Sequence, residues 1–171
     1  MSASEKSTVN GTASTAPANL PDFHTAPGHL FRRGRQLHDA LWLVHVSDEL
    51  TPLQYAVLTA LALEPDIDQR TLGERIALDK STVGDIVNRM YGRGLIARQT
   101  SPQDSRRNLL SLTDSGRSVL NEAAPGVERI GAEIFSALTT DERDELLRLM
   151  NKLLYSHTNG RAESDRNSTR R

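Results

Sequence analysis

Two adjacent arginines, Arg106 and Arg107, follow a polar Ser-Pro-Gln-Asp-Ser turn that begins at Ser101. Short β-prone runs lie on both sides of this turn, at residues 95–100 and 108–113, which is the pattern of a two-stranded hairpin with a basic tip. Arginine side chains at such a tip can enter the narrow, electronegative minor groove of DNA. The segment therefore indicates a DNA-probing hairpin.

A helix with one apolar and one polar face is predicted just before this hairpin. Val83, Ile86, Val87 and Met90 recur at the spacing of one helical face, so we expect them to point inward. A short helix over residues 69–77 precedes it, and the pair forms a helix-turn-helix, whose second helix offers polar residues to base edges in the major groove. Those residues are Lys80, Ser81, Thr82, Asp85, Asn88 and Arg89.

Further helices must hold these two segments in place. Apolar spacing and end signals predict helices over about 28–47, 51–64, 113–138 and 139–157, with a break at 64–68 and a glycine stop at Gly92 and Gly94. Thr51 and Gln54 have the spacing of a capping box, as do Thr139 and Glu142. The predicted fold class is mainly α with a small β wing.

Two interior details of these helices are also predicted. The helix that follows Thr51 should bury Leu53, Val57, Leu58 and Leu61. The pair Pro125 and Gly126 should kink the helix that Thr113 caps.

Composition sets the outer limits. The 171 residues allow one domain, and the ends, residues 1–22 and 158–171, are polar stretches that we predict to be disordered tails. The chain has no cysteine, which excludes disulfides and thiolate chemistry, and it has no long apolar run or apolar leader, so a cytoplasmic protein without a membrane span is expected. Residues 69–117 hold nine basic and five acidic residues, whereas residues 118–157 hold four and seven, so charge is divided along the chain.

Residues 28–155 resemble the MarR family of bacterial transcription regulators. The resemblance lies in "LDKSTVGDIVNRMYGRGLIAR" and in the wing pattern that Asp104, Arg106, Leu112, Thr113 and Gly116 match in order. It implies that Arg106 enters the minor groove and that Asp104 holds the wing. One departure is Gly84-Asp85, where many relatives have Thr-Arg; an acid there repels phosphates but can accept a bond from a cytosine amine.

The resemblance also implies a domain organisation and a homodimer. The family-type domain would span residues 23–157, with a winged helix-turn-helix over about 51–113 and N- and C-terminal dimerisation helices over about 28–47 and 113–157. Two recognition helices of the dimer would meet successive major grooves of a double-stranded operator, about 34 Å apart.

The first predicted helix holds an unusual set of polar residues and suggests an effector site. It resembles the start of a MarR branch that controls the breakdown of aromatic acids such as hydroxybenzoates, hydroxycinnamates and hydroxynicotinates. The predicted ligand-binding residues are His29, Arg32, Arg33, His38 and Trp42. Guanidinium groups suit a carboxylate, and a Trp and a His suit a hydroxylated ring. Arg32 and His38 lie six residues apart, about 120° around a helix, so they converge only in a pocket that wraps the helix or that spans the dimer.

Other functions are weighed against this one. The histidine and arginine cluster could be structural, which would leave a DNA-binding regulator without an effector. The Asp85 departure is compatible with a protein-interaction module that has lost DNA binding. No nucleophile motif, glycine-rich phosphate loop or metal-ligand set is present, so we expect neither an enzyme nor a cofactor or metal site.

Overall fold

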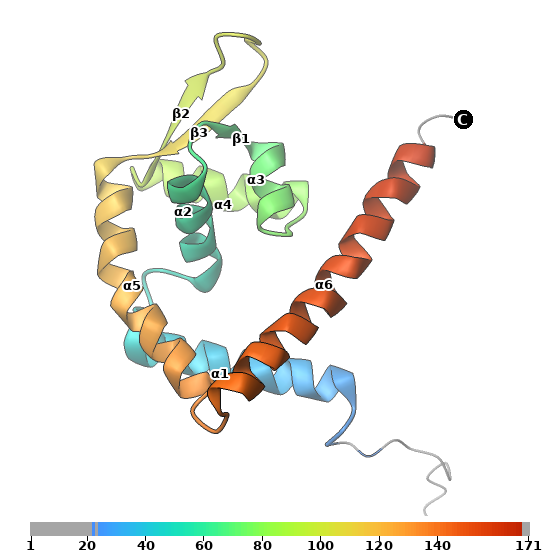
Figure 1. Cartoon of the computed structure of the whole chain (residues 1–171). Helices are drawn as coiled ribbons and strands as arrows, with labels where there is room; N and C mark the ends of the chain where they lie inside the picture. Colours follow the sequence, from blue (N-terminus) through green and yellow to red (C-terminus); the bar gives the residue numbers. More distant parts are fainter. Residues whose placement is uncertain (1–21, 23, 169–171) are drawn as a thin grey trace, which may run out of the picture. The chain divides into compact units, whose positions relative to one another are not determined.

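The computed structural model describes residue 22 and residues 24–168, with side chains described as far as residue 155. Helices dominate this part of the chain, and three short strands complete it, which confirms the predicted fold class (Figure 1). In chain order the elements are α1 (Pro27–His45), α2 (Pro52–Leu63), β1 (Ile67–Asp68), α3 (Gln69–Arg75), α4 (Lys80–Gly92), β2 (Ile96–Thr100), β3 (Asn108–Leu112), α5 (Asp114–Ile134) and α6 (Thr140–Ser168). The described residues divide into two compact units between Gln36 and Leu37, so the boundary falls within α1. None of the helices in the described ranges has the length and apolar character needed to cross a membrane.

The predicted capping box starts α2. The Thr51 hydroxyl accepts a hydrogen bond from the Gln54 N–H, and the Gln54 side chain accepts one from the Thr51 N–H. Three of the four apolar residues expected on its inner side are buried. Leu53 is the exception and is 45% exposed, because the capping box turns the neighbouring Gln54 inward.

The strands form one antiparallel sheet in the order β1-β3-β2. β2 and β3 are the predicted hairpin, which projects beyond α3 and α4 (Figure 1). β1 falls where the sequence predicted only a break: Ile67 pairs with Leu110, and Asp68 pairs with Leu109. A strand of two residues has no alternating pattern, so the sequence contains no period that would predict it.

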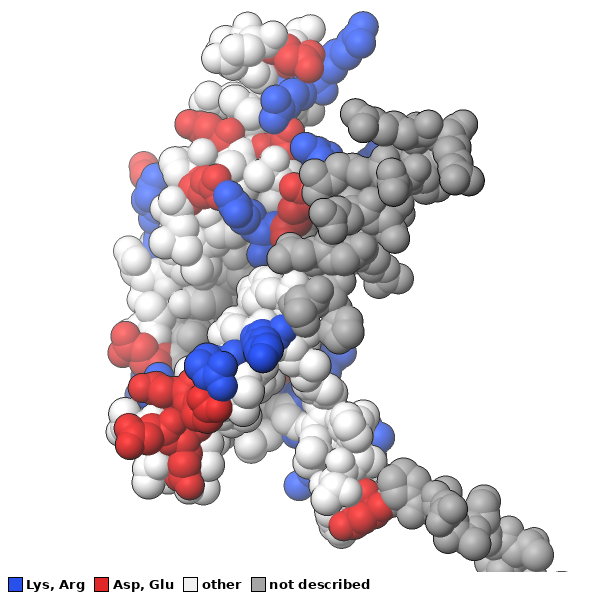
Figure 2. All heavy atoms as spheres, turned by 45° about the vertical axis from the view of Figure 1, so that its right-hand side comes forward, with Lys and Arg blue, Asp and Glu red and all other residues white. Residues whose placement is uncertain are grey.

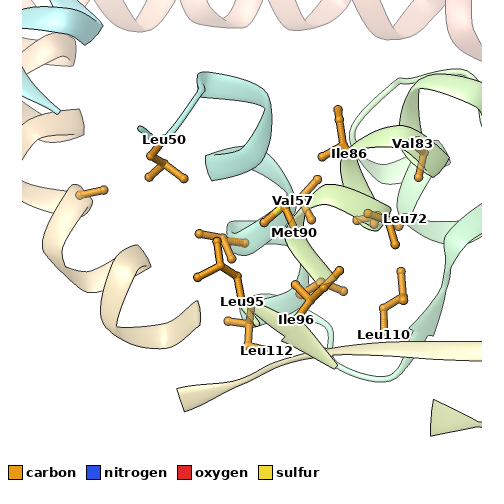
Figure 3. Close-up of a cluster of buried hydrophobic side chains, with 14 of the residues drawn as sticks. Leu50, Val57, Leu72, Val83, Ile86, Met90, Leu95, Ile96, Leu110 and Leu112 are labelled. Carbon is orange, nitrogen blue, oxygen red and sulfur yellow. The ribbon is translucent and has the colours of Figure 1, made fainter. Parts of the chain in front are cut away.

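The core of the second unit lies between α2, α3, α4 and the sheet. Figure 3 shows the inward side chains of α4 meeting Val57 of α2, Leu72 of α3 and Leu110 of β3. The four predicted residues of the α4 stripe, Val83, Ile86, Val87 and Met90, are at most 5% exposed. Burying each such side chain contributes about 1.5–3 kcal/mol. This packing therefore determines which face of α4 points outward.

Two residues with positive φ end helices of the helix-turn-helix. α3 ends at Arg75, slightly before the predicted end at Ala77, because Ala77 has φ 54° and cannot continue a right-handed helix. Gly94, with φ 71°, provides the left-handed stop after α4 that the sequence predicted. Gly92 is the last residue of α4 and keeps a negative φ.

α5 runs as one helix through Pro125, and two of its glycines allow close packing. A β-carbon at Gly116 would lie 2.0 Å from the Leu95 carbonyl oxygen, at the base of the hairpin. A β-carbon at Gly126 would lie 2.2 Å from the carbonyl oxygen of His45, the last residue of α1. Both glycines therefore serve close approach of backbones, a role that their place in the sequence does not reveal.

α6 starts at the predicted capping box, in which the Glu142 carboxylate accepts the Thr139 N–H at 2.8 Å. The helix runs to Ser168, beyond residue 157, where a disordered tail was expected. Residues 158–168 contain no proline and include Arg161, Ala162 and Glu163, which favour helix. Of the two predicted tails, residues 1–21 and 169–171 lie outside the described residues.

Candidate DNA-binding and effector sites

The outward face of α4 carries the six polar residues predicted to read DNA. Thr82 is partly buried, and the other five, Lys80, Ser81, Asp85, Asn88 and Arg89, are exposed. Among the described residues no cation pairs with the Asp85 carboxylate; the nearby Arg89 side chain bonds instead to the Asp85 backbone oxygen, at 3.3 Å. The face is therefore polar and of mixed charge.

Asp79 caps α4 and engages two of these residues. Its carboxylate accepts hydrogen bonds from the hydroxyls of Ser81 and Thr82, both at 2.6 Å. It also accepts the two backbone N–H groups, both at 3.0 Å. The Ser81 and Thr82 side chains, and then the backbone bonds, hold the pKa of Asp79 well below its usual range. Both hydroxyl protons thus point to Asp79, which leaves the hydroxyl oxygens with lone pairs that can accept hydrogen bonds.

Asn88 is tied to the hairpin. Its side-chain oxygen accepts a hydrogen bond from Arg98 Nη2 at 2.5 Å, and the Arg98 guanidinium lies over the Tyr91 ring, 4.9 Å from its centroid. This contact orients the amide so that its NH2 group is the part that can donate to DNA. The sequence did not predict a role for Arg98, because no local pattern relates a strand residue to a side chain ten positions earlier.

The wing is the loop of residues 101–107 that joins β2 to β3. The Ser101 N–H donates to the Arg107 carbonyl at 2.9 Å and closes the loop. Within the loop, the Arg107 N–H donates to the Asp104 carbonyl at 2.9 Å, and the Arg106 N–H donates to the Asp104 carboxylate at 3.0 Å. Asp104 therefore orders the backbone that carries both arginines.

The two wing arginines have different surroundings. Arg107 donates through Nε, at 2.9 Å, and through Nη2 to one carboxylate oxygen of Asp68. The other oxygen of Asp68 accepts the Thr71 N–H at 2.8 Å and so caps α3. The Thr71 backbone and side chain, and after them Arg107, lower the pKa of Asp68 to about 2 against the opposing effect of partial burial. Arg106 is exposed, and none of the described residues pairs with its guanidinium.

Charge is divided in space as it is along the sequence. Figure 2 shows Lys and Arg side chains projecting at the upper end of the molecule, with some Asp and Glu among them, and a denser acidic group at the lower end. That acidic group includes Asp141 and Glu142 in the first turn of α6. The division favours approach of a polyanion from the side of the wing.

Three predicted ligand residues lie in the first unit, on the N-terminal part of α1. Arg32 Nη2 donates to His29 Nδ1 at 2.8 Å. Partial burial, and then the charges of Arg32 and Arg33, lower the pKa of His29 and so favour its neutral ring. Both arginines are exposed. Their guanidinium groups carry the positive charge and the N–H donors that bind a carboxylate.

The other two, His38 and Trp42, lie in the second unit. Trp42 is 4% exposed, and its indole N–H donates to the Leu50 carbonyl at 2.6 Å, so it is part of the core. Its ring lies 5.7 Å from the His38 ring and 5.6 Å from the Tyr55 ring, centroid to centroid. The three rings form an aromatic row in which the His38 side chain is 38% exposed. The His38 ring is thus open to a ligand, whereas the Trp42 ring is not.

Tyr55 connects this aromatic row to a cavity that the sequence did not predict. The cavity is an open surface hollow of about 420 Å³, lined by residues of α2, α5 and α6. Its walls are Tyr55, Ala124, Val127, Glu128, Gly131, Ala132 and Arg143. Nearby, His45 Nε2 lies 2.6 Å from Glu133 Oε1, at an angle outside hydrogen-bond geometry. No three His, Asp or Glu side chains within the described ranges are grouped as a metal site.

Comparison with known proteins agrees with this architecture. Residues 48–107 match the model of the MarR family. The HTH-type transcriptional repressor NicR of Pseudomonas putida is 32% identical over 151 residues, which cover 86% of this chain and 96% of NicR. The chain therefore belongs to the MarR family of transcriptional regulators.

Solved structures with the same fold include regulators studied with small molecules. The transcriptional regulator PcaV of Streptomyces coelicolor, in complex with its natural ligand, is 43% identical with a TM-score of 0.76, covering 79% of this chain and 96% of PcaV. BpsR of Bordetella bronchiseptica, whose DNA binding is regulated by 6-hydroxynicotinic acid, is 33% identical with a TM-score of 0.68, covering 74% and 96%.

Proposed function

We propose that the chain is a homodimeric repressor that binds a double-stranded operator and is released by a small aromatic carboxylic acid. The acid would be of the hydroxybenzoate, hydroxycinnamate or hydroxynicotinate type and would bind between the DNA-binding and dimerisation parts. One observation carries the DNA-binding half: α4 presents a fixed polar face beside a wing whose tip carries the exposed Arg106. A helix for the major groove and an arginine for the minor groove are the two parts that such recognition needs.

Exposed apolar side chains on α1 and α6 support the dimer. Leu43 and Val44 of α1 are 67% and 73% exposed, and Leu149 of α6 is 46% exposed. Apolar surface at several neighbouring positions of a helix is typical of a protein interface. In a two-fold dimer the same helices of two copies would cover one another.

The proposal of an aromatic-acid effector is supported by the polar residues of α1 and by two related regulators. BpsR responds to an N-heteroaromatic acid, and PcaV was solved with its natural ligand. In this chain Arg32 is the proposed carboxylate partner and His38 the proposed partner of a ring hydroxyl. The acid can release DNA only if it binds the DNA-free form more tightly than the DNA-bound form.

The DNA-binding half is tested with a labelled duplex from the region upstream of the chain's own gene, by fluorescence anisotropy at several salt concentrations. Arg106→Ala should weaken binding and reduce the slope of log Kd against log salt by about one, since one cation that displaces counterions from the DNA is lost. Arg148→Ala, an exposed arginine on α6 paired with Glu145, is the control and should change neither. Equal losses for both variants would point to unspecific charge effects.

Binding of the proposed effector can be followed by the fluorescence of a tryptophan in the protein itself. Trp42 is the only tryptophan, and its ring contacts Tyr55, which lines the cavity. A panel of aromatic acids should therefore change Trp42 emission, and the acid that does so should also lower operator affinity. Arg32→Ala should weaken that response, whereas Arg35→Ala, a change of charge on the same helix, should preserve it. An unchanged response in Arg32→Ala would remove Arg32 from the site.

A regulator without an effector is the second candidate. It is favoured by the bonds that the cluster already makes, because Trp42 donates to Leu50 and Arg32 donates to His29. Melting temperature distinguishes the two, since a ligand that binds only the folded protein raises it by mass action. No shift with any acid of the panel would favour this candidate.

A further inference from the structure

If the wing binds DNA, Arg106 and Arg107 have different roles. The difference follows from the ion pair between Arg107 and Asp68. We infer that Arg107 is a positioning residue, which sets the direction of the wing through Asp68 and leaves the DNA contact to Arg106. The inference rests on the proposed DNA binding and deepens it.

The register of the sheet places the two partners together. Asp68 of β1 lies opposite Leu109 of β3, and Arg107 is the last wing residue before β3, two positions ahead of Leu109 in the sequence. Side chains two positions apart along a strand share one face of the sheet, which brings Arg107 toward Asp68. The bonds from Nε and Nη2 then complete the contact.

Asp68 links the wing to the helix-turn-helix. One of its oxygens holds the N-terminus of α3 through the Thr71 N–H, and the other holds the wing through Arg107. Its side chain is 15% exposed, so water screens the ion pair only partly. β1 itself is only two residues long and offers few other bonds between the hairpin and α3. We therefore take the Asp68 carboxylate as the brace, meaning the group that fixes the angle between the hairpin and α3.

Fixing Arg107 also fixes Arg106. The two residues share a peptide bond, and both of their N–H groups are held by Asp104. With the Arg107 side chain drawn toward Asp68, the backbone at the tip cannot rotate freely, and Arg106 leaves it in one direction. A guanidinium that must enter a groove about 6 Å wide depends on that direction.

One substitution separates this role from direct DNA contact, because the two predict opposite signs. Asp68→Asn keeps the cap of α3, since Asn caps helices as well as Asp does, but it removes the charge that holds Arg107. If Arg107 were a phosphate contact, this change would release a cation and remove an anion near DNA, and binding would tighten. If Arg107 positions the wing, binding weakens, and we expect about a tenfold rise in Kd.

The experiment measures anisotropy with the upstream duplex for Asp68→Asn, Arg107→Ala and the double variant, across a salt series. We expect both single variants to weaken binding, the double variant to be no weaker than either, and the salt slope to stay at the wild-type value, in contrast to Arg106→Ala. Tighter binding by Asp68→Asn, or a slope reduced by Arg107→Ala as much as by Arg106→Ala, would overturn the inference.

A second measurement needs no DNA and so separates this inference from the proposed function. In the free protein, hydrogen exchange of the Ser101 and Arg107 amides should speed up in Asp68→Asn and in Arg107→Ala, because both amides are bonded within the wing. The amide of Glu64, bonded to Ala60 at the end of α2, is the internal control. Unchanged exchange in the wing would overturn the brace even if the protein bound no operator, and faster exchange there would support it in that case too.

Discussion

The carbonyl oxygen of His45 occupies the place of the side chain that Gly126 lacks. A β-carbon at Gly126 would lie 2.2 Å from that oxygen and 3.0 Å from Val46 Cγ2. The end of α1 and the middle of α5 therefore meet at a point where only glycine fits.

Gly126→Ala should lower the free energy of unfolding by about 1–3 kcal/mol or more, because the clash is with backbone, which cannot rotate away. Gly131→Ala is the matched control in the same helix: nothing lies within 4 Å of its β-carbon, and alanine gains about 0.5–1 kcal/mol over glycine in a helix. Urea denaturation of both variants measures the difference. Equal stabilities would mean that α1 and α5 can separate at no cost.

Ala77→Gly should stabilise the protein. Ala77 has φ 54° in the turn between α3 and α4, where a residue with a β-carbon costs about 1–2 kcal/mol. Glycine removes that cost but adds about 0.5–1 kcal/mol of chain entropy to the unfolded state, so a net gain of about 0.5–1 kcal/mol is expected. The melting temperature should rise, and that of Ala62→Gly, near the end of α2, should fall. A lower melting temperature for Ala77→Gly would show that the turn is not strained.

Acid should remove the contribution of Asp68. Its folded pKa of about 2 lies below the usual value of about 3.9, so the ionised form stabilises the native state above about pH 4, and this stability is lost as the pH falls toward 2. The difference in unfolding free energy between wild type and Asp68→Asn should therefore be constant near neutral pH and shrink between pH 4 and 2. Urea titrations at a series of pH values test this, and a difference that does not vary with pH would contradict it.

Asp85 should bias the operator toward cytosine. Its carboxylate is exposed on the outward face of α4, and carboxylates accept bonds from the cytosine amine in the major groove. Asp85→Asn should shift the preference at that base pair toward adenine, which pairs with Asn through two bonds, and should strengthen binding to unrelated DNA by removing a negative charge. Selection from a randomised duplex library with both proteins reports the preferred base. The same preferred base for both would remove Asp85 from base recognition.

Local features could be predicted from the sequence, and features built by distant residues could not. The capping box at Thr51, the inward stripe that includes Val83 and the hairpin with its turn all lie within short windows, and the structure has them. The pairing of Arg107 with Asp68 joins residues 39 positions apart through an unpredicted strand. Likewise, the need for glycine at position 126 depends on where α1 ends, which only the packed structure specifies.

The first turn of α4 has a fixed polarity of hydrogen bonding. Since Asp79 takes the hydroxyl protons of Ser81 and Thr82, these oxygens can only accept hydrogen bonds, and the same holds for the carboxylate of Asp85 in the next turn. Groups that can only accept hydrogen bonds pair with the amino groups of adenine and cytosine. They cannot bond to the major-groove edge of guanine, which carries only acceptors. The half-site should therefore present amines to this turn, with guanines placed where a cation from Lys80 or Arg89 arrives.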